Sequence, residues 1–290
     1  MKTIMKQFLF AITALLAVAT LSAQTTKEKT LLWKISGKGI QHPSYIFGTF
    51  HLLCADDFKI PDTVLSVIHQ SKQLFFEIKM DDPDITKKMM KTIQMKDGHQ
   101  LKDFISMKDY DFVSTIFQNK TQIPLQFVAN YKPVILVSLL YPSMLGCSPV
   151  AFEKEIEKMA AKDSLPIYGL ETIEFQISIF DTIPYNEQAR MLIKSVLNFD
   201  DSKKELSEMI NMYQKKDITA MQASIGSDKD FGKYETILLN KRNENWIPVI
   251  SKAVLEKTSF FAVGAGHLGG NNGVLNLLRK NGFTVSPVKY

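Results

Sequence analysis

Strand-like and helix-like segments alternate along most of this 290-residue chain, and this alternation constrains the fold more than any other feature. The strand-like segments are short and rich in β-branched and aromatic residues, whereas the helix-like ones carry apolar residues at three- and four-residue spacing. Strands are predicted over 31–35, 44–50, 73–79, 167–170, 260–264 and 283–288, and helices over 61–70, 171–180 and 274–280. Such an order is typical of an α/β fold, in which helices flank a mixed, largely parallel sheet.

Long helical tracts interrupt this alternation. They cover 83–118, 149–163, 186–198 and 201–256, where Leu, Ile, Met and Phe recur among Lys and Glu. We interpret them as long helical insertions whose apolar sides face the core. Because no low-complexity linker separates them from the strands, residues 24–290 are predicted to form a single domain.

Residues 1–23 have the pattern of a signal peptide. Lys2 and Lys6 precede an apolar run over 8–21, and a boundary of small residues follows at Ser22-Ala23. The run is too short for a comfortable membrane span, so cleavage is expected in place of retention as an N-terminal anchor. The protein is therefore predicted to be exported, either periplasmic or secreted, with no stable membrane span after cleavage.

Charge and motif content argue against two kinds of ligand, a nucleic acid and a dinucleotide cofactor. Without Lys2 and Lys6 the formal net charge falls from +5 to +3, and the other basic residues are interleaved with acids, so no nucleic-acid partner is predicted. Residues 264–270 match G-x-G-x-x-G after a strand, yet a dinucleotide site also needs an acid about twenty residues further on. No Asp or Glu occurs from Gly264 to Tyr290, and this excludes a dinucleotide cofactor.

Cys54 and Cys147 are the two cysteines of the chain. In an oxidising compartment an even pair can form one disulfide, and we predict that bond here. Two unpaired thiols are the alternative. A third possibility follows from the spacing His51-x-x-Cys54, which is that of a metal-ligand pair.

Two histidines follow predicted strands in the same local pattern of apolar strand, glycine, two residues and histidine. These G-x-x-H turns run from Gly48 to His51 and from Gly264 to His267. In a largely parallel sheet both turns leave the carboxyl ends of their strands, where open α/β sheets bind ligands, so we predict that they face one cleft. For either histidine alone, a hydrogen-bonded structural role is the alternative.

Glu77 lies inside the apolar strand predicted over 73–79. A carboxylate buried there would need a partner such as a cation, a metal ion or a hydrogen-bond donor. The alternative is a solvated strand face, because strand alternation places Glu77 and Lys79 on the same side.

Polar side chains also gather at three later positions. Glu171 is placed at the start of a predicted helix, where an acid complements the helix dipole. Arg242 and Asn243 stand at the start of another helix near Trp246, and solvent exposure is their default expectation. Neither H-E-x-x-H nor G-x-S-x-G occurs, so the common zincin and α/β-hydrolase motifs do not explain these residues.

Six sequence blocks together resemble the TraB/GumN family across nearly the whole mature chain. The blocks are LLWKISG, YIFGTFH, FFEIKM, GLETIEFQ, RNENW and FAVGAGHLGGNNGVLNLLRKNGFTVSPV. This family includes the animal Tiki proteins, described as metal-dependent proteases, and is grouped more distantly with erythromycin esterase and the haem-binding ChaN proteins. The resemblance implies a divalent metal ion, with Mn, Co and Zn as candidates, held by His51, Glu77 and His267. It implies as catalytic candidates Glu77, Glu171, Arg242 and Asn243.

Two functions are compatible with this set of residues. The first is an exported metal-dependent hydrolase, a peptidase, in which two imidazoles and a carboxylate hold an ion that activates water and Glu171 acts as general base. Its partner would be a peptide or small-molecule substrate. The alternative is a non-catalytic binding protein that sequesters a peptide, a haem or another small ligand in the same cleft.

Overall fold

The computed structural model of the chain describes residues 29–290, and the predicted signal peptide over 1–23 lies outside the described residues. At its centre is a six-stranded sheet in the order β6-β4-β7-β2-β1-β8. The strands are β1 (Leu32–Ser36), β2 (Ser44–Thr49), β4 (Gln73–Ile78), β6 (Ile167–Glu171), β7 (Ser259–Gly264) and β8 (Thr284–Pro287). Each predicted strand is present, and its ends differ from the prediction by at most one residue.

The sheet is mixed, and its central pairs are parallel. β4 runs parallel to β6 and β7, and β7 runs parallel to β2, whereas β1 is antiparallel to both β2 and β8. Gly37 and Gly39 have φ values of 79° and 82°, which only glycine adopts freely, and they let the chain reverse between β1 and β2. The predicted α/β fold with a mixed, largely parallel sheet is confirmed.

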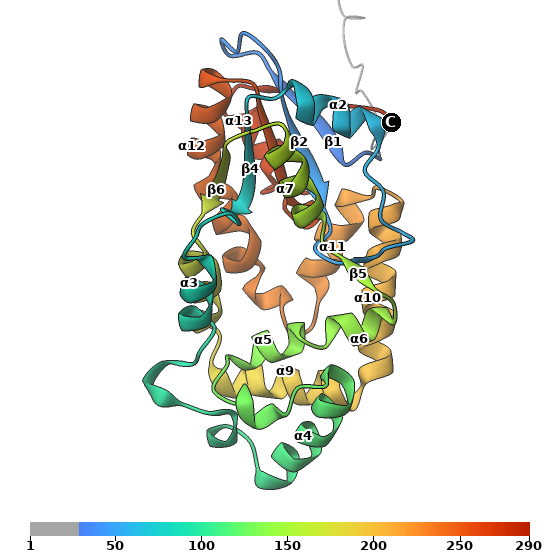
Figure 1. Cartoon of the computed structure of the whole chain (residues 1–290), viewed down its shortest axis with the longest axis vertical. Helices are drawn as coiled ribbons and strands as arrows, with labels where there is room; N and C mark the ends of the chain where they lie inside the picture. The colour runs from blue at the N-terminus through green and yellow to red at the C-terminus, as the bar shows by residue number, and fades with distance from the viewer. Residues whose placement is uncertain (1–28) are drawn as a thin grey trace, which may run out of the picture.

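Helices cover both faces of the sheet (Figure 1). The helices that pack around it are α2 (Asp62–Gln70), α7 (Phe152–Lys162), α12 (Lys241–Glu256) and α13 (Val274–Lys280). Phe47 of β2 packs against Phe152 of α7, with ring centroids 6.0 Å apart. The strand register places Gln73 on the opposite face, where its side chain donates to the carbonyl of Ala253 in α12 at 3.2 Å. The sheet is therefore enclosed between α7 and α12.

A helical region forms the other end of the elongated molecule (Figure 1). It contains α4 (Met107–Thr121), α5 (Pro133–Ser138), α6 (Tyr141–Leu145) and α9 (Tyr185–Leu197). Phe117, Leu136 and Leu192 belong to a second apolar cluster there, separate from the cluster around the sheet. Burying each side chain of this size contributes about 1.5–3 kcal/mol, so this region has a core of its own.

The predicted helical tracts are more broken than their sequences indicate. The tract over 201–256 divides into α10 (Phe199–Gln214), α11 (Ile218–Ser227), the π-helical segment η6 (Thr236–Asn240) and α12. α10 ends just before Lys216, which adopts a positive φ of 55° that a helix cannot continue through. The tract over 149–163 begins with a strand, β5 (Pro149–Val150), which pairs with β3 (Leu53–Cys54).

Short elements complete the chain. The remaining helices are α3 (Ile85–Thr92) and α8 (Ile173–Ser178). Single 3-10 turns are η1 (Lys96–Gly98), η2 (Leu101–Asp103), η3 (Leu125–Phe127), η4 (Ile179–Thr182), η5 (Gly232–Tyr234) and η7 (Ala265–His267). No helix within residues 29–290 has the length and apolar character needed to cross a membrane.

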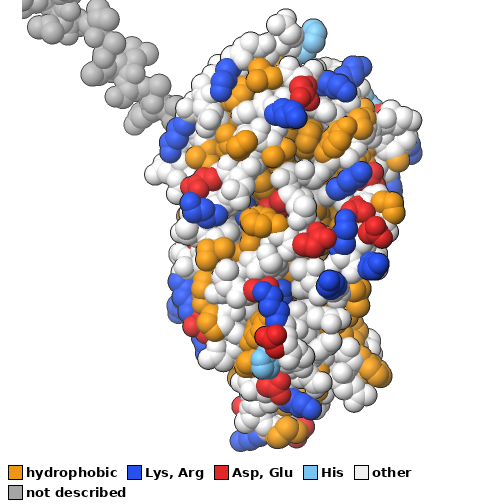
Figure 2. All heavy atoms as spheres, turned by 90° about the vertical axis from the view of Figure 1, so that its left-hand side faces the viewer, with side chains coloured by type: hydrophobic (Ala, Val, Ile, Leu, Met, Phe, Trp, Pro, Cys, Tyr) orange, Lys and Arg blue, Asp and Glu red, His pale blue; other side chains and the backbone are white. Residues whose placement is uncertain are grey.

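Charged side chains of both signs are mixed on the face that carries α3 and α12. Figure 2 shows Lys and Arg side chains interspersed with Asp and Glu there, with single apolar side chains between them. This face carries no basic stripe of the kind that follows a nucleic-acid backbone.

Candidate metal centre

Four strand ends reach the same level of the sheet. In the parallel ladders Thr49 of β2 lies opposite Gly264 of β7, and Ile78 of β4 lies opposite Glu171 of β6. Both G-x-x-H turns therefore leave neighbouring parallel strands at their carboxyl ends. In open α/β sheets this edge is where ligands bind.

His267 is buried in η7, directly after β7. Its Nδ1 lies 2.6 Å from Asn243 Oδ1, and the Asn243 amide nitrogen donates to the carbonyl of Asn272 at 2.9 Å. Since the amide oxygen of Asn243 can only accept, Nδ1 of His267 carries the proton and Nε2 keeps its lone pair. Burial, followed by the positive charge of Arg242, lowers the pKa of His267 to about 3. The imidazole is therefore neutral at physiological pH.

Glu77 is also buried, on the α12 side of β4. Its Oε1 accepts from the backbone N–H of Gly264 at 2.8 Å, and its Oε2 accepts from Arg242 Nη2 at 2.6 Å and from Gln176 Nε2 at 2.8 Å. Burial acts to raise the pKa of Glu77, but the nearby Arg242 guanidinium holds it well below its usual range. The solvated-face interpretation of Glu77 is wrong, because the carboxylate is enclosed and paired.

Arg242 joins two carboxylates and one imidazole. Its Nη2 lies 2.6 Å from Glu77 Oε2 and 2.6 Å from Glu171 Oε1, and its Nη1 donates to His267 Nε2 at 3.0 Å. The side chains of Arg242 and Glu171 are only 10% and 4% exposed, so the solvent-exposed position expected for Arg242 is wrong. The guanidinium holds the acids of β4 and β6 against the start of α12.

Glu171 has a different setting from the one expected. It is the last residue of β6, and the following helix α8 begins at Ile173, so the helix dipole does not account for it. Its Oε2 accepts from the Trp246 indole N–H at 3.0 Å, and its Oε1 accepts from Arg242 and from Gln176 at 3.1 Å. Burial raises the pKa of Glu171 although its bonds to Arg242 and Trp246 oppose this.

His51 lies on the other side of the centre, and 69% of its side chain is exposed. Its Nδ1 is 3.1 Å from Glu153 Oε1, which also accepts from the Thr49 hydroxyl at 2.7 Å. Desolvation acts to lower the pKa of His51, but the hydrogen bond and the negative charge of Glu153 outweigh it and raise the pKa to about 9. Because Nδ1 is engaged by Glu153, Nε2 is the nitrogen left for a ligand.

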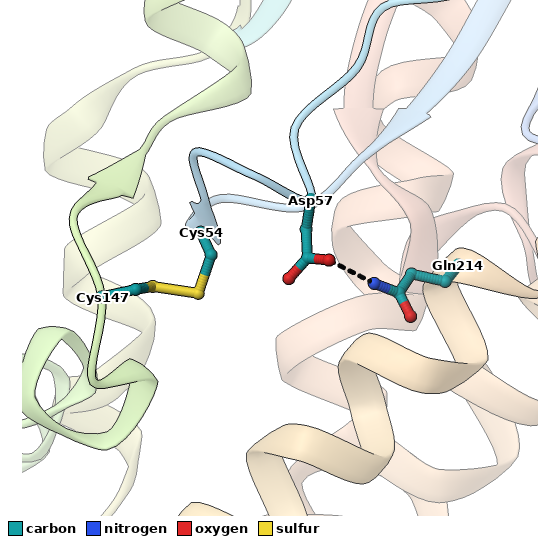
Figure 3. Close-up of a disulfide and its surroundings, with 4 residues drawn as sticks. All are labelled: Cys54, Asp57, Cys147 and Gln214. Carbon is teal, nitrogen blue, oxygen red and sulfur yellow. Dashed lines mark hydrogen bonds between the residues drawn. A yellow bond between two sulfur atoms is a disulfide. The ribbon is translucent and has the colours of Figure 1, made fainter.

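The segment after His51 is tied to the start of α7. A disulfide joins Cys54 of β3 to Cys147, which closely precedes β5, and β3 pairs with β5 (Figure 3). Nearby, Gln214 of α10 donates to Asp57 at 3.0 Å. Because α7 begins with Phe152-Glu153, these links hold the His51 turn beside the carboxylate that binds it.

Gly264 lies among the three predicted metal ligands. A Cβ atom placed on Gly264 would lie 3.1 Å from Glu77 Oε1, 3.6 Å from His267 Cδ2 and 3.9 Å from His51 Nε2. His267 Nε2 and Glu77 Oε1 are 3.9 Å apart. A side chain at position 264 would therefore enter the space that these donors share.

The donor set has the chemistry of a first-row metal site, although Arg242 now pairs with two of its members. Two imidazole nitrogens and one carboxylate oxygen are the usual ligands of a three-residue catalytic site. Within residues 29–290, no group of three His, Cys, Asp or Glu side chains already meets in ligating geometry. The residues fit a metal ion by donor type.

Three residues of this centre are not among the sequence candidates, namely Glu153, Gln176 and Trp246. In the sequence Trp246 is only a neighbour of Arg242. In the structure its indole N–H donates to Glu171, and its ring centroid lies 4.5 Å from that of His267. Gln176 stands inside the GLETIEFQ block, which marks its region but not its role. Glu153 is one of several acids in α7, and no local pattern distinguishes it.

Comparisons with known proteins give two relatives that are named as metalloproteases. Metalloprotease TIKI2 from Xenopus tropicalis is 23% identical, and the match covers 84% of this chain and 57% of the relative. Metalloprotease TIKI1 from Homo sapiens is 25% identical over 91% of this chain and 63% of the relative. The chain thus spans less than two thirds of the length of these relatives, and no solved structure matches it. A model of the TraB/PrgY/gumN family matches residues 31–287, and the protein belongs to that family.

Proposed function

We propose that this protein is an exported metal-dependent hydrolase, a peptidase, with a divalent ion held by His51, Glu77 and His267. The observation that carries the proposal is the position of these three side chains around Gly264, at the carboxyl ends of neighbouring parallel strands. The two G-x-x-H turns would then face one cleft. Distant similarity to two relatives named as metalloproteases supports the same reaction class.

Each of the two proposed histidine ligands is oriented by a second residue. Asn243 holds Nδ1 of His267, and Glu153 holds Nδ1 of His51, so the Nε2 atoms are the ligating ones. Such partners fix the ring and its tautomer, and losing one typically costs about 10–100-fold in metal affinity. A bound ion would supply a water of lowered pKa and polarise the scissile carbonyl.

The remaining charged groups have distinct proposed roles. Arg242 keeps Glu77 ionised, and its guanidinium lies where it can also stabilise negative charge that develops on a substrate oxygen. Both oxygens of Glu171 already accept hydrogen bonds, from Arg242, Gln176 and Trp246. A general-base role for Glu171 would require one of these bonds to break, so we favour a positioning role through Arg242.

Elemental analysis of the purified protein, combined with a broad peptide-cleavage screen, tests the proposal. We expect about one Mn, Co or Zn ion per chain and cleavage of at least one peptide class. His51→Ala and His267→Ala should each lose both, whereas His69→Ala should lose neither. His69 is a matched control because it is an exposed histidine paired with a carboxylate, Asp163, as His51 is with Glu153. Metal content that survives both substitutions would contradict the proposed centre.

One observation favours a non-catalytic alternative. Arg242 donates to His267 Nε2 and to Glu77, so two of the proposed donors are already engaged by a protein cation. If the guanidinium stays there, the cleft would bind a peptide, a haem or another small ligand without turnover. Tight peptide binding without cleavage, or a haem absorption band in protein that lacks first-row metal, would decide for sequestration.

Export is a separate proposal, supported by the signal-peptide pattern over 1–23. The disulfide between Cys54 and Cys147 is the kind of bond that persists in an oxidising compartment such as the periplasm or the extracellular space. Intact-mass measurement of protein from the cell envelope or medium should give a chain that begins near Gln24. Protein from either fraction that still carries Met1 to Ala23 would overturn the proposal.

A further inference from the structure

A cavity of about 280 Å³ lies next to the proposed metal centre. Its wall includes Asn243, whose amide oxygen is 2.6 Å from His267 Nδ1. The other polar residues that line it are Gln222, Glu235, Asn240, Asn271 and Asn272. This volume lies just below the range for small-molecule sites, about 300–1,000 Å³, and is suited to one amino-acid side chain.

Glu235 is the one charged residue that lines this cavity. Its Oε1 accepts from Gln222 Nε2 at 2.7 Å, which fixes the orientation of the carboxylate. Among the described residues, no Lys, Arg or His forms an ion pair with Glu235. Lys280 donates to the carbonyl of Asn271, one of the lining residues, at 3.2 Å. The cavity therefore holds a half-buried negative charge without a counter-ion from within residues 29–290.

The amide side chains around Glu235 can accept further hydrogen bonds. Asn243 uses both of its side-chain atoms, one on His267 and one on Asn272. In the part of the chain that the structure describes, the side chains of Asn240, Asn271 and Asn272 form no hydrogen bond. Amide oxygens beside an unpaired carboxylate match the several N–H donors of a guanidinium or an ammonium group.

The backbone around the cavity explains why the site is not visible in the sequence. Leu239 and Asn240 line it from η6, the π-helical turn that precedes α12, and Glu235 lies directly before this turn. A π-helical turn changes the direction in which the following side chains point, and such turns occur frequently at functional sites. On the other side the wall is formed by glycines between 266 and 273, so backbone approaches the cavity closely.

We propose that this cavity is a specificity subsite that binds the cationic side chain of an arginine or lysine in a peptide substrate. The proposal rests on the peptidase function proposed above, and Asn243, which binds His267, belongs both to the cavity wall and to the metal centre. Glu235 supplies the opposite charge, and the surrounding asparagines accept the remaining N–H groups.

Binding of two matched probes to the purified full chain tests this subsite. N-acetyl-arginine amide carries a guanidinium, and N-acetyl-citrulline amide replaces it with a neutral urea of almost the same shape. We expect the arginine probe to bind about tenfold more tightly by calorimetry, since a charge-assisted hydrogen bond to Glu235 is worth about 1.4 kcal/mol or more. Equal affinity of the two probes would overturn the proposal, and this comparison requires no variant.

Substitutions then show which residue causes the preference for the arginine probe over the citrulline probe. Glu235→Gln should reduce the arginine-to-citrulline ratio to about one, whereas Glu244→Gln should leave it unchanged, because Glu244 is an exposed acid that pairs with Lys241. A ratio that persists in a folded Glu235→Gln protein would place the cation elsewhere. His51→Ala should keep the ratio, because His51 does not line the cavity. In the unsubstituted protein, absence of any hydrolysis with the ratio intact contradicts only the peptidase, and hydrolysis without a preference for arginine contradicts only the subsite.

Discussion

His51 and His267 come from the same local pattern on neighbouring parallel strands, yet their surroundings are opposite. The side chain of His267 is 7% exposed and is held by a neutral amide, Asn243, and a cation, Arg242. That of His51 is 69% exposed and is held by a carboxylate, Glu153. The pKa of His267 is lowered to about 3, and that of His51 is raised to about 9.

This difference teaches that a shared motif fixes where a histidine emerges but not its protonation state. The strand and its G-x-x-H turn bring both imidazoles to one edge of the sheet, and then α12 and α7 supply different partners. His267 is built into the core as a neutral acceptor. His51 is a charged group on the surface of the same centre, and a metal ion would have to displace its proton.

Replacing Arg242 with Met should have the largest effect on this contrast. The substitution leaves Glu77 and Glu171 buried without a counter-charge, and breaking a buried pair in this way typically costs about 3–5 kcal/mol. The free energy of unfolding, from urea denaturation, checks it. Lys241→Met is the control, because Lys241 pairs with Glu244 at the surface and should change stability by less than about 0.5 kcal/mol. Equal losses in the two variants would mean that the buried network contributes nothing special.

Replacing each histidine with alanine should have the next largest effect, and the loss of stability should differ between His267 and His51. His267→Ala opens a cavity beside Trp246 and leaves the Asn243 oxygen without its donor, so we expect a loss of about 2–4 kcal/mol. His51→Ala removes an exposed side chain and should cost less than about 1 kcal/mol. Thermal and urea unfolding of the two proteins measure the difference. Similar losses would remove the distinction between a core histidine and a surface histidine.

The sheet could be predicted from the sequence because its strands are local apolar runs of β-branched and aromatic residues. Breaks within the helical tracts are harder to predict from the sequence. Nothing in the apolar spacing of 201–256 indicates the positive φ of Lys216 or the π-helical segment η6. α5 and α6 were not predicted because they are short and apolar, with a proline in the first turn of each. Helix periodicity needs more residues than these segments contain.

The candidate site divides in a similar way. His51, Glu77 and His267 stand out locally, because each is a chemically reactive group within or directly after an apolar strand. Glu153 and Gln176 do not stand out in the sequence, because their partners are distant in the chain. His51 lies 102 residues from Glu153, and Glu77 lies 99 residues from Gln176. Exposure was misjudged for Arg242 for the same reason, because the two acids that bury its charge come from β4 and β6.

Replacing Glu153 with Gln should weaken metal binding without unfolding the protein. The neutral amide keeps the size of the side chain but no longer fixes Nδ1 of His51 through a charge, and loss of such a partner lowers metal affinity by about tenfold or more. Competition with a chelator measures the affinity. Glu155→Gln is the control, because Glu155 lies on the same helix and pairs with Lys158 at the surface. Equal metal affinity in both variants would show that Glu153 does not position His51.

The change in the free energy of unfolding at alkaline pH is the smallest expected effect, and it tests the charge of His51 alone. A histidine whose pKa rises from 6.5 to about 9 on folding stabilises the metal-free protein below pH 6.5, and this contribution is lost as the pH rises from 6.5 to 9. Because the side chain is mostly exposed, solvent screening should keep the change under about 1 kcal/mol. Urea unfolding of wild type and Glu153→Gln should therefore give free energies that differ most near pH 6 and converge near pH 9.5. His267 is neutral in the folded protein throughout this range, and the titration of its unfolded form is the same in both proteins, so its contribution cancels in the difference. A difference that stays constant from pH 6 to pH 9.5 would mean that Glu153 stabilises the fold through packing and not through the charge on His51.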